Sequence, residues 1–436
     1  MALAAASELE SRTMRKITWR LVPFLMLCYF IAYLDRVNVG FAGASMRHDL
    51  NLSAEAFGGA AGIFFIAYFF FEVPSNLALN RFGARKWIAR IMFTWGLVSG
   101  AQAFVTGEVS FNIVRLLLGV AEAGFFPGII FFLTLWFPSI YRARIVGLFM
   151  FAIPISTVIG SPISGLVLGL EGVWGLHGWQ WVYLIEALPA LLMTFAVLYY
   201  LTDRPADARW LEPDERQWIQ ARLDSERVNR ETFFKLSVPQ SIIKPRVLLL
   251  GCVYMALNVP QYGLSFFLPQ IVKAFGVSNV EAGFITALPY AVGGIGMIIW
   301  GRHSDKKHER VWHCVIPFAA MVVGLGLAAV LPNPIAKMAV LCVAGWGFFS
   351  ILPVFWTLPT AFLSGAGAAA GIAAVNSIGN LGGYFGPKIF GSLKDATGGD
   401  TASLVFLACS AFLGIVLVLS LGHNKALERA PSVAAE

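Results

Sequence analysis

The chain has 436 residues, of which 58% are hydrophobic and only 13% are charged, and its formal net charge is +7. Soluble domains carry about 25% charged residues, so this composition excludes an ordinary soluble domain and indicates a membrane protein. The positive charge lies mainly in loops between apolar segments, which is typical of the inside loops of a membrane protein and does not indicate nucleic-acid binding.

The first apolar run gives no sign of a cleaved signal peptide. The Ala-rich start precedes the first charges, and the run after Arg20 continues to Asp35 without an A-x-A-like site. Five scattered cysteines lack a CxxC spacing, and we expect small buried thiols rather than a disulfide framework or a metal site.

A membrane-spanning helix needs about 20 mainly apolar residues. The chain offers twelve such segments, at 20–42, 57–78, 86–105, 110–136, 144–169, 179–201, 247–268, 281–300, 312–331, 335–362, 368–391 and 401–422. One long polar stretch separates the sixth segment from the seventh, and we expect a linker with short amphipathic helices there. Glu212-Pro213-Asp214-Glu215 predicts the start of one such helix, with Pro and acidic residues in its first turn.

The charges predict the orientation and the domains. If the N-terminus is inside, most of the 32 Lys and Arg residues fall on the cytoplasmic side, so we expect both termini there. Short basic loops at 80–86 and 301–307 occupy corresponding places, as in a transporter built from two related halves. The predicted segments are a cytoplasmic tail, a six-helix bundle, a cytoplasmic linker, a second six-helix bundle and a cytoplasmic tail, at 1–19, 20–201, 202–245, 246–422 and 423–436.

Four charged residues lie inside the first and fourth spans: Asp35 and Arg36, then Arg115 and Glu122. An ionised group at the bilayer centre costs from ~2.5 kcal/mol to ~10 kcal/mol or more. Arg115 and Glu122 are seven residues apart and therefore share one helix face, about 10.5 Å apart along the axis. Pro127 is expected to kink the helix after them. We expect the four groups to share one cavity; the alternative is fixed structural ion pairs.

Arginine suits carboxylate capture, because its planar fork makes bidentate hydrogen bonds and stays charged. All six histidines lie in loops or at span ends, so carboxylates must carry any transported proton. Burial favours the protonated form of a carboxyl and a nearby arginine opposes it. We therefore predict Asp35 and Glu122 as proton-coupling sites and Arg36 and Arg115 as substrate-binding residues, with protons as coupling ions and no cofactor.

The stretch Tyr33–Ala42 resembles the first-helix signature of the anion:cation symporter family of the major facilitator superfamily. Arg115–Gly128 is similar to the fourth-helix signature, and Trp181–Ala187, which contains Glu186, is also similar. Pro353–Thr360, with residues 363–365 and 371–376, most resembles the bacterial tartrate, sugar-acid and phthalate branch. The usual Asp-Arg-x-Gly-Arg-Arg loop motif of the superfamily has Asn80 and Ala84 here in place of Asp and Arg, whereas Asp305 is retained in the second copy.

The resemblance implies an all-α integral membrane protein with the major facilitator fold, twelve transmembrane helices in two six-helix bundles. It places Tyr68 at the substrate carboxylate and makes Trp356 and Asn376 specificity residues. Asn380, one helical turn after Asn376, shares its face; the alternative for both is hydrogen bonding between helices. Gating or structural roles are expected for Glu72, Arg81, Glu186 and Asp305, with Glu72 facing the basic loops.

These expectations combine into a proton-coupled symporter that imports a small organic anion by alternating access. The expected substrate is a hydroxy-acid or sugar-acid such as tartrate, and an aromatic carboxylate such as phthalate is the alternative. We expect a monomer in the bacterial inner membrane, with the lipid bilayer and no nucleic acid as partner. A transporter-like sensor is a third possibility, while a membrane-embedded enzyme lacks any HExxH, GxSxG or Cys/His cluster.

Overall fold

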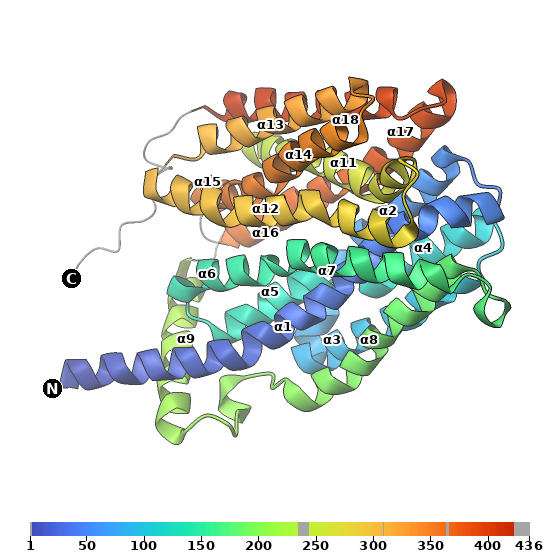
Figure 1. The fold of residues 1–436 in the computed structure, drawn as a ribbon. Helices are drawn as coiled ribbons and strands as arrows, with labels where there is room; N and C mark the ends of the chain where they lie inside the picture. The colour runs from blue at the N-terminus through green and yellow to red at the C-terminus, as the bar shows by residue number, and fades with distance from the viewer. Residues whose placement is uncertain (1, 234–243, 308, 363–365, 423–436) are drawn as a thin grey trace.

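The computed structural model describes residues 2–233, 244–307, 309–362 and 366–422, and this part of the chain is helical throughout. Figure 1 shows two groups of helices, α1 to α8 and α11 to α18, lying against each other, with α9 across one end of the first group. We call this the α9 end and the other the opposite end. α1 begins and α18 finishes on the side of the α9 end.

The first half and the segment after it contain these helices: α1 (Ala2–Asp49), α2 (Ala54–Phe82), α3 (Ala84–Ala101), α4 (Glu108–Glu122), α5 (Phe125–Trp136), α6 (Ser139–Met150), α7 (Ala152–Val167), α8 (Gly178–Tyr200) and α9 (Pro213–Phe233). Short 3-10 turns lie at Gln102–Phe104, Leu168–Leu170, Val173–Gly175 and Pro205–Asp207. The second half contains α11 (Pro245–Lys273), α12 (Asn279–Lys307), α13 (Val311–Val330), α14 (Pro334–Phe355), α15 (Thr357–Phe362), α16 (Ala366–Asn380), α17 (Gly382–Thr397) and α18 (Thr401–Leu421).

Every predicted span coincides with one helix or one broken pair of helices. Within the described residues, ten segments are long and apolar enough to cross a membrane. The two further spans are α3, whose first turns carry Arg85, Lys86 and Arg90, and the broken pair α16–α17. The predicted helix start is confirmed at Pro213. The first span is much longer than predicted, because its polar N-terminal part continues as helix and is held by ion pairs to α9.

The fourth span is broken where the sequence predicts a kink. α4 ends at Glu122 and α5 begins at Phe125. Between them Gly124 has φ 85°, a left-handed conformation that glycine adopts without a steric penalty. Pro127 in the first turn of α5 lacks the N–H that would continue the hydrogen-bond ladder of α4. The break leaves Glu122 as the last residue of α4.

Among the described residues, the two halves meet mainly along three helix pairs: α1 with α11, α2 with α17, and α7 with α12. α2 and α17 approach most closely toward the opposite end. There a Cβ atom on Gly58 would overlap the backbone oxygen of Pro387, and one on Gly391 would overlap that of Ala54. This backbone-to-backbone contact closes the opposite end between these two helices.

The five cysteines are free. Cys28 and Cys314 are buried, as predicted, Cys252 and Cys342 are half-buried, and Cys409 is exposed on α18, so the expectation of buried thiols is wrong at Cys409 and holds only in part at the other two. α18 lies at the edge of its bundle, where one helix face has no protein neighbour (Figure 1).

Candidate functional site

A small cavity lies between the two halves, near the middle of the helices. Its walls come from α1, α2, α5, α6 and α7 on one side and from α11, α14 and α16 on the other, and aromatic rings dominate them. Its volume is about 40 Å³, which is less than an organic acid needs, so binding requires the halves to move. Among the described residues that line it, Arg36 carries the only positive charge.

Glu122, which does not line the cavity, neutralises the charge of Arg36. Its Nη2 forms an ion pair with Oε1 of Glu122, and both side chains are largely buried. The guanidinium also lies over aromatic rings, 5.3 Å from the centroid of Phe64 and 5.8 Å from that of Tyr68. The Tyr33 ring lies 5.6 Å away as well. A cation held by one carboxylate and these three rings is positioned to exchange that carboxylate for another.

Asp35 points away from this cavity. Its Oδ2 accepts a hydrogen bond from Trp95 Nε1 at 2.6 Å, and its Oδ1 accepts one from Asn38 Nδ2 at 3.4 Å. Successive residues on a helix project about 100° apart, so Asp35 and Arg36 face different neighbours. The expectation of one cavity shared by all four charged groups is therefore wrong for Asp35.

Arg115 also lies outside the cavity. It is buried, its Nη2 donates to the backbone oxygen of Ala61 at 2.7 Å, and its guanidinium lies 5.3 Å from the Phe64 ring centroid. Among the described residues it forms no ion pair with a carboxylate. The Phe64 ring thus has Arg36 and Arg115 both against it, and Arg115 does not line the cavity.

In the second half, Asn376 and Asn380 both line the cavity, as does Tyr68 in the first half. Asn376 Nδ2 donates to Glu72 Oε1 at 3.1 Å, and Ser377 Oγ donates to Glu72 Oε2 at 3.5 Å. Glu72 therefore connects α2 to α16, and the expectation that it faces the basic loops is wrong. The physical reason is that α2 packs along the second half, so its inner face meets α16 rather than a loop.

Trp356 lies one layer behind the cavity wall. Its ring packs edge-on against Tyr254, with centroids 5.1 Å apart, and Tyr254 itself lines the cavity. Across the cavity, Gln261 Nε2 donates to the hydroxyl of Tyr33 at 2.8 Å and so connects the two halves. Trp356 is placed to shape the wall through Tyr254 rather than to contact a bound molecule in this conformation.

The remaining predicted residues lie apart from the cavity. Glu186 is buried on α8, where its Oε1 accepts a hydrogen bond from Ser164 Oγ at 2.6 Å. Asp305 pairs with Arg310 Nη1 at 2.7 Å near the α9 end. Arg81 is exposed, and its guanidinium lies 5.7 Å from the Phe82 ring centroid.

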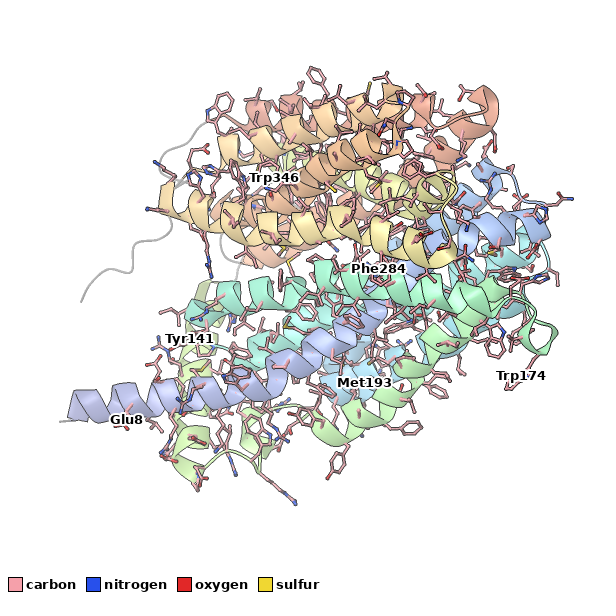
Figure 2. All side chains as sticks on the ribbon, in the orientation of Figure 1. Glu8, Tyr141, Trp174, Met193, Phe284 and Trp346 are labelled. Atoms are coloured by element: carbon pink, nitrogen blue, oxygen red, sulfur yellow. The ribbon has the colours of Figure 1, made fainter. Side chains whose placement is uncertain are left out.

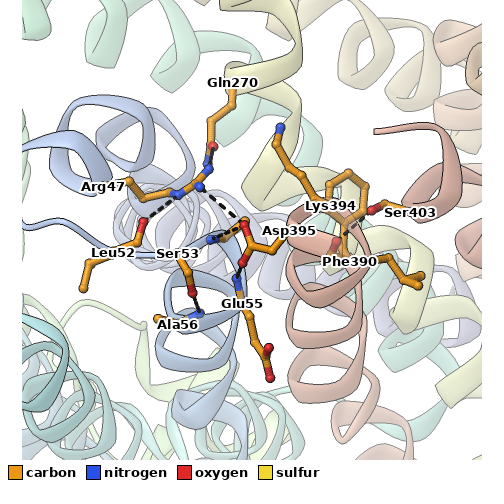
Figure 3. Close-up of polar contacts among 12 residues, drawn as sticks. Arg47, Leu52, Ser53, Glu55, Ala56, Gln270, Phe390, Lys394, Asp395 and Ser403 are labelled. Carbon is orange, nitrogen blue, oxygen red and sulfur yellow. Dashed lines mark hydrogen bonds and ion pairs between the residues drawn. The ribbon is translucent and has the colours of Figure 1, made fainter. Parts of the chain in front are cut away.

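A polar cluster at the opposite end, shown in Figure 3, was not predicted from the sequence. Asp395 on α17 accepts hydrogen bonds from the backbone N–H groups of Ala54 and Glu55, at 3.0 and 2.7 Å, at the start of α2. Arg47 lies 4.0 Å from the same carboxylate and donates to Gln270 of α11 at 3.1 Å. These contacts join the halves. They span more than 200 residues for Arg47–Gln270 and more than 300 for Asp395 with the start of α2, and no local pattern encodes such pairings.

A second set of contacts holds the α9 end of the first half together. Arg12 pairs with Asp214 at 2.7 Å, and Lys16 pairs with Glu215 at 3.0 Å. Tyr141, labelled in Figure 2, donates its hydroxyl proton to Glu10 at 2.7 Å. These contacts tie α1 to α9 and α6 and involve no residue of the second half.

Comparisons with known proteins agree with this architecture. The model of the Major Facilitator Superfamily matches residues 25–387. A relative from Agrobacterium vitis described as "Putative tartrate transporter" is 50% identical over 424 residues, which is 97% of this chain and 94% of the relative. A "Quinolone resistance transporter" from Acinetobacter baumannii is 42% identical over 94% of this chain and 95% of the relative. Among solved structures, a bacterial homologue of the human lysosomal transporter Spinster, in an inward-facing and occupied conformation, superposes with a TM-score of 0.77. The match covers 94% of this chain and 98% of that chain at 16% sequence identity.

Proposed function

We propose a transport function for this chain, which belongs to the Major Facilitator Superfamily and is therefore a multi-pass membrane transporter with that all-helical fold. The specific proposal is a proton-coupled symporter that imports a small organic anion by alternating access. The substrate class is a hydroxy-acid or sugar-acid such as tartrate.

The observation that carries this proposal is the pairing of Arg36 with Glu122 at the cavity wall. A guanidinium facing a cavity is a carboxylate receptor, but only when its own counter-ion is neutral. A proton on Glu122 removes that competition and frees Arg36 for the substrate carboxylate. Loss of the proton on the other side of the membrane restores the ion pair and expels the anion. Proton and anion thereby bind together and leave together.

Asp35 is proposed as a second proton site. It is buried beside Arg36 on α1, and among the described residues it has hydrogen-bond donors but no cationic partner within ion-pair distance. A proton can enter or leave it without breaking an ion pair. Because Asp35 and Arg36 belong to one helix, a movement of α1 changes the contacts of both side chains together.

Recognition of hydroxyl groups is assigned to neutral polar side chains of the cavity wall: Tyr68, Asn376 and Asn380, with Gln261 beside them. Their amides and hydroxyls can donate to and accept from the hydroxyls of a sugar-acid. The name of the 50% identical relative supports a tartrate-like substrate.

One observation favours the aromatic alternative. The cavity wall is rich in rings, including Tyr29, Phe65, Phe126, Tyr254 and Tyr262. Such rings provide stacking surface for an aromatic carboxylate. The name of the 42% identical relative, "Quinolone resistance transporter", supports testing aromatic acids beside tartrate.

We assign the α9 end to the cytoplasm, because the basic loops after α2 and α12 lie there. With this orientation, the contact of Gly58 and Gly391 across α2 and α17 closes the external side. The two halves, 20–201 and 246–422, would rock about the cavity as bodies joined by the linker at 202–245. The membrane is proposed to be the bacterial inner membrane.

Uptake into proteoliposomes under an imposed pH gradient tests the proposal. Purified full-length protein should accumulate tartrate or a related acid when the outside is acidic, and a screen across hydroxy-, sugar- and aromatic acids identifies the substrate. Glu122→Gln and Asp35→Asn should abolish accumulation while leaving exchange of substrate at equal pH. Glu108→Gln, at the exposed start of α4, is the matched control. Accumulation that survives in both Asp35→Asn and Glu122→Gln would exclude these carboxyls as coupling sites.

A further inference from the structure

We propose that Glu186 on α8 is a further proton site and that Asn38 connects it to Asp35. The site is a buried pair of carboxyl groups bridged by one amide, in the interior of the first half and away from the cavity. Its consequence for transport rests on the proton coupling proposed above, whereas its protonation can be measured without any transport.

The geometry of the three side chains carries the proposal. Asp35, Asn38 and Glu186 are each at most 1% exposed. Asn38 Nδ2 donates to Asp35 Oδ1 at 3.4 Å, and the Asn38 side chain also contacts the carboxyl of Glu186. Glu186 Oε1 accepts from Ser164 Oγ at 2.6 Å. One amide therefore lies between two acids from α1 and α8.

Two buried oxygen atoms of this group lack partners among the described residues. Glu186 Oε2 and Asn38 Oδ1 form no hydrogen bond there. An ionised Glu186 would leave Oε2 as an unsatisfied charged acceptor, and an unsatisfied buried charged group costs several kcal/mol. A proton on Glu186 turns the same carboxyl into a donor, and Asn38 Oδ1 is an unused acceptor on the side chain that contacts it. Protonation therefore satisfies both atoms after a rotation of either side chain.

The surroundings offer no compensating positive charge. In the part of the chain that the structure describes, neither Asp35 nor Glu186 forms an ion pair with Lys, Arg or His. The acids Glu186 and Glu122 both act electrostatically on Asp35. Tyr183, one turn before Glu186 on α8, interacts electrostatically with both Glu186 and Arg115.

The remaining neighbours are neutral donors. α3 contributes Trp95 and Ser99 beside Asp35, and α7 contributes Ser164 beside Glu186. Two negative charges in such a site repel each other, and two carboxyls that share a site do not both ionise in the neutral range.

The position of the pair connects it to the movement of the halves. α1 and α7 are two of the three helices of the first half that pack against the second half, on α11 and α12. α8 packs against α1, α3 and α7. Helices α1, α7 and α8 therefore form a junction that contains Asp35 and Asn38 of α1, Ser164 of α7 and Glu186 of α8. Two of these helices, α1 and α7, pack against the second half. A shift of α1 or α7 changes the hydrogen bonds of Glu186 without solvent entering from the cavity.

Infrared spectroscopy of the purified full-length protein tests the protonation. The C=O stretch of a protonated carboxyl should be present near neutral pH, shift on exchange into D₂O and disappear in Glu186→Gln. Asn38→Ala should leave the band but shift its frequency, because the acceptor is lost. Glu108→Gln, which changes an exposed acid, should leave the band unaltered. A band that is identical in wild type, Glu186→Gln and Asn38→Ala overturns the proposal, and Asn38→Ala decides the question if Glu186→Gln fails to fold.

The coupling is tested in proteoliposomes with the membrane potential clamped and a pH gradient of about one unit. Each coupled proton contributes 1.36 kcal/mol per pH unit, so losing one proton should lower the steady-state accumulation of substrate about tenfold. Glu186→Gln should show this loss and retain exchange at equal pH. Wild-type accumulation in Glu186→Gln overturns the coupling role of Glu186. If instead the wild-type protein accumulates no organic acid under any gradient, the proposed function fails, and the infrared result stands by itself.

Discussion

Two neighbouring residues of α1 face different sides of the helix. Arg36 lines the cavity and Asp35 faces Trp95 of α3. The sequence identifies both as exceptional, because charges inside an apolar span are expensive. It does not show their directions, which depend on how α1 is rotated against its neighbours. For the same reason Arg115 was expected in the cavity, although Phe64 lies against it instead.

Asn376 offers a test of substrate recognition at the scale of one residue. Asn376→Ala removes a polar group of the cavity wall and one hydrogen bond to Glu72. A hydrogen bond is worth roughly 0.5–1.5 kcal/mol, so we expect the Kd for the hydroxy-acid to rise about twofold to twelvefold, measured by calorimetry on purified protein. Ser377→Ala removes the other bond to Glu72 but leaves the cavity wall intact, and it is the control. An equal loss in both variants would assign Asn376 to the contact between halves instead.

His177, in the loop before α8, provides a pH-dependent contact. A hydrogen bond to Glu171 at 2.8 Å raises the pKa of His177 above its usual 6.5. Burial acts in the opposite direction, and the negative charge of Asp49 adds to the rise. The charged form therefore stabilises the loop fully below about pH 6.5, and this contribution is lost as pH rises through the folded-state pKa. Glu171→Gln should lower the pKa of His177, measured from its ring signals by NMR. An unchanged titration in Glu171→Gln would rule out Glu171 as the cause.

Among the helices, the contact of α2 with α17 decides which end of the molecule is closed. Gly58→Leu places a side chain where the backbone of Pro387 lies, so we expect the opposite end to open. Spin labels at the exposed positions Val109 and Thr397 in a cysteine-free background should report a longer distance. Gly59→Leu, with nothing within 4 Å of the added Cβ, is the matched control. A distance that lengthens equally in both variants, or in neither, contradicts the assigned contact.

The elements themselves were largely predictable. Apolar length identified ten spans directly, and Pro127 indicated the break in the fourth, because both signals are local. The extent of α1 was not predictable from apolar length, since the part before Arg20 is polar and its helix is stabilised by Arg12 and Lys16 against α9. The contacts of Glu72 with Asn376, and of Asp395 with the start of α2, were also missed, because each joins residues more than 300 positions apart.

At the scale of the whole molecule, the described contacts of α9 tie it to α1 and α5 of the first half. Glu215 is the buried centre of this attachment. Burial acts to raise its pKa. A hydrogen bond from the backbone N–H of Glu212 and the charges of Lys16 and Arg12 outweigh burial and hold the pKa below its usual 4.5. Its ionised form therefore stabilises the attachment above the unfolded-state pKa, and that contribution is lost as pH falls through the lower, folded-state value.

Glu215→Gln should release α9 from α1. Hydrogen bonds to a charged group contribute about 1.5–3 kcal/mol, so amide hydrogen exchange in α9 should accelerate at least about tenfold. Asp214→Asn, which changes a half-exposed partner of Arg12, should have a much smaller effect. Equal acceleration in the two variants would show that surface charge alone, and not the buried carboxylate, holds α9. The variant should leave the cavity intact, since α9 contributes no residue to it.

The pairing of Arg36 with Glu122 also has an electrical consequence. An unpaired arginine that moved through the full membrane field would work against about 2.3 kcal/mol per 100 mV. In the empty carrier the two opposite charges move together, so this pair adds no net charge to the returning step. The voltage across the membrane therefore does no net work on this pair as it moves.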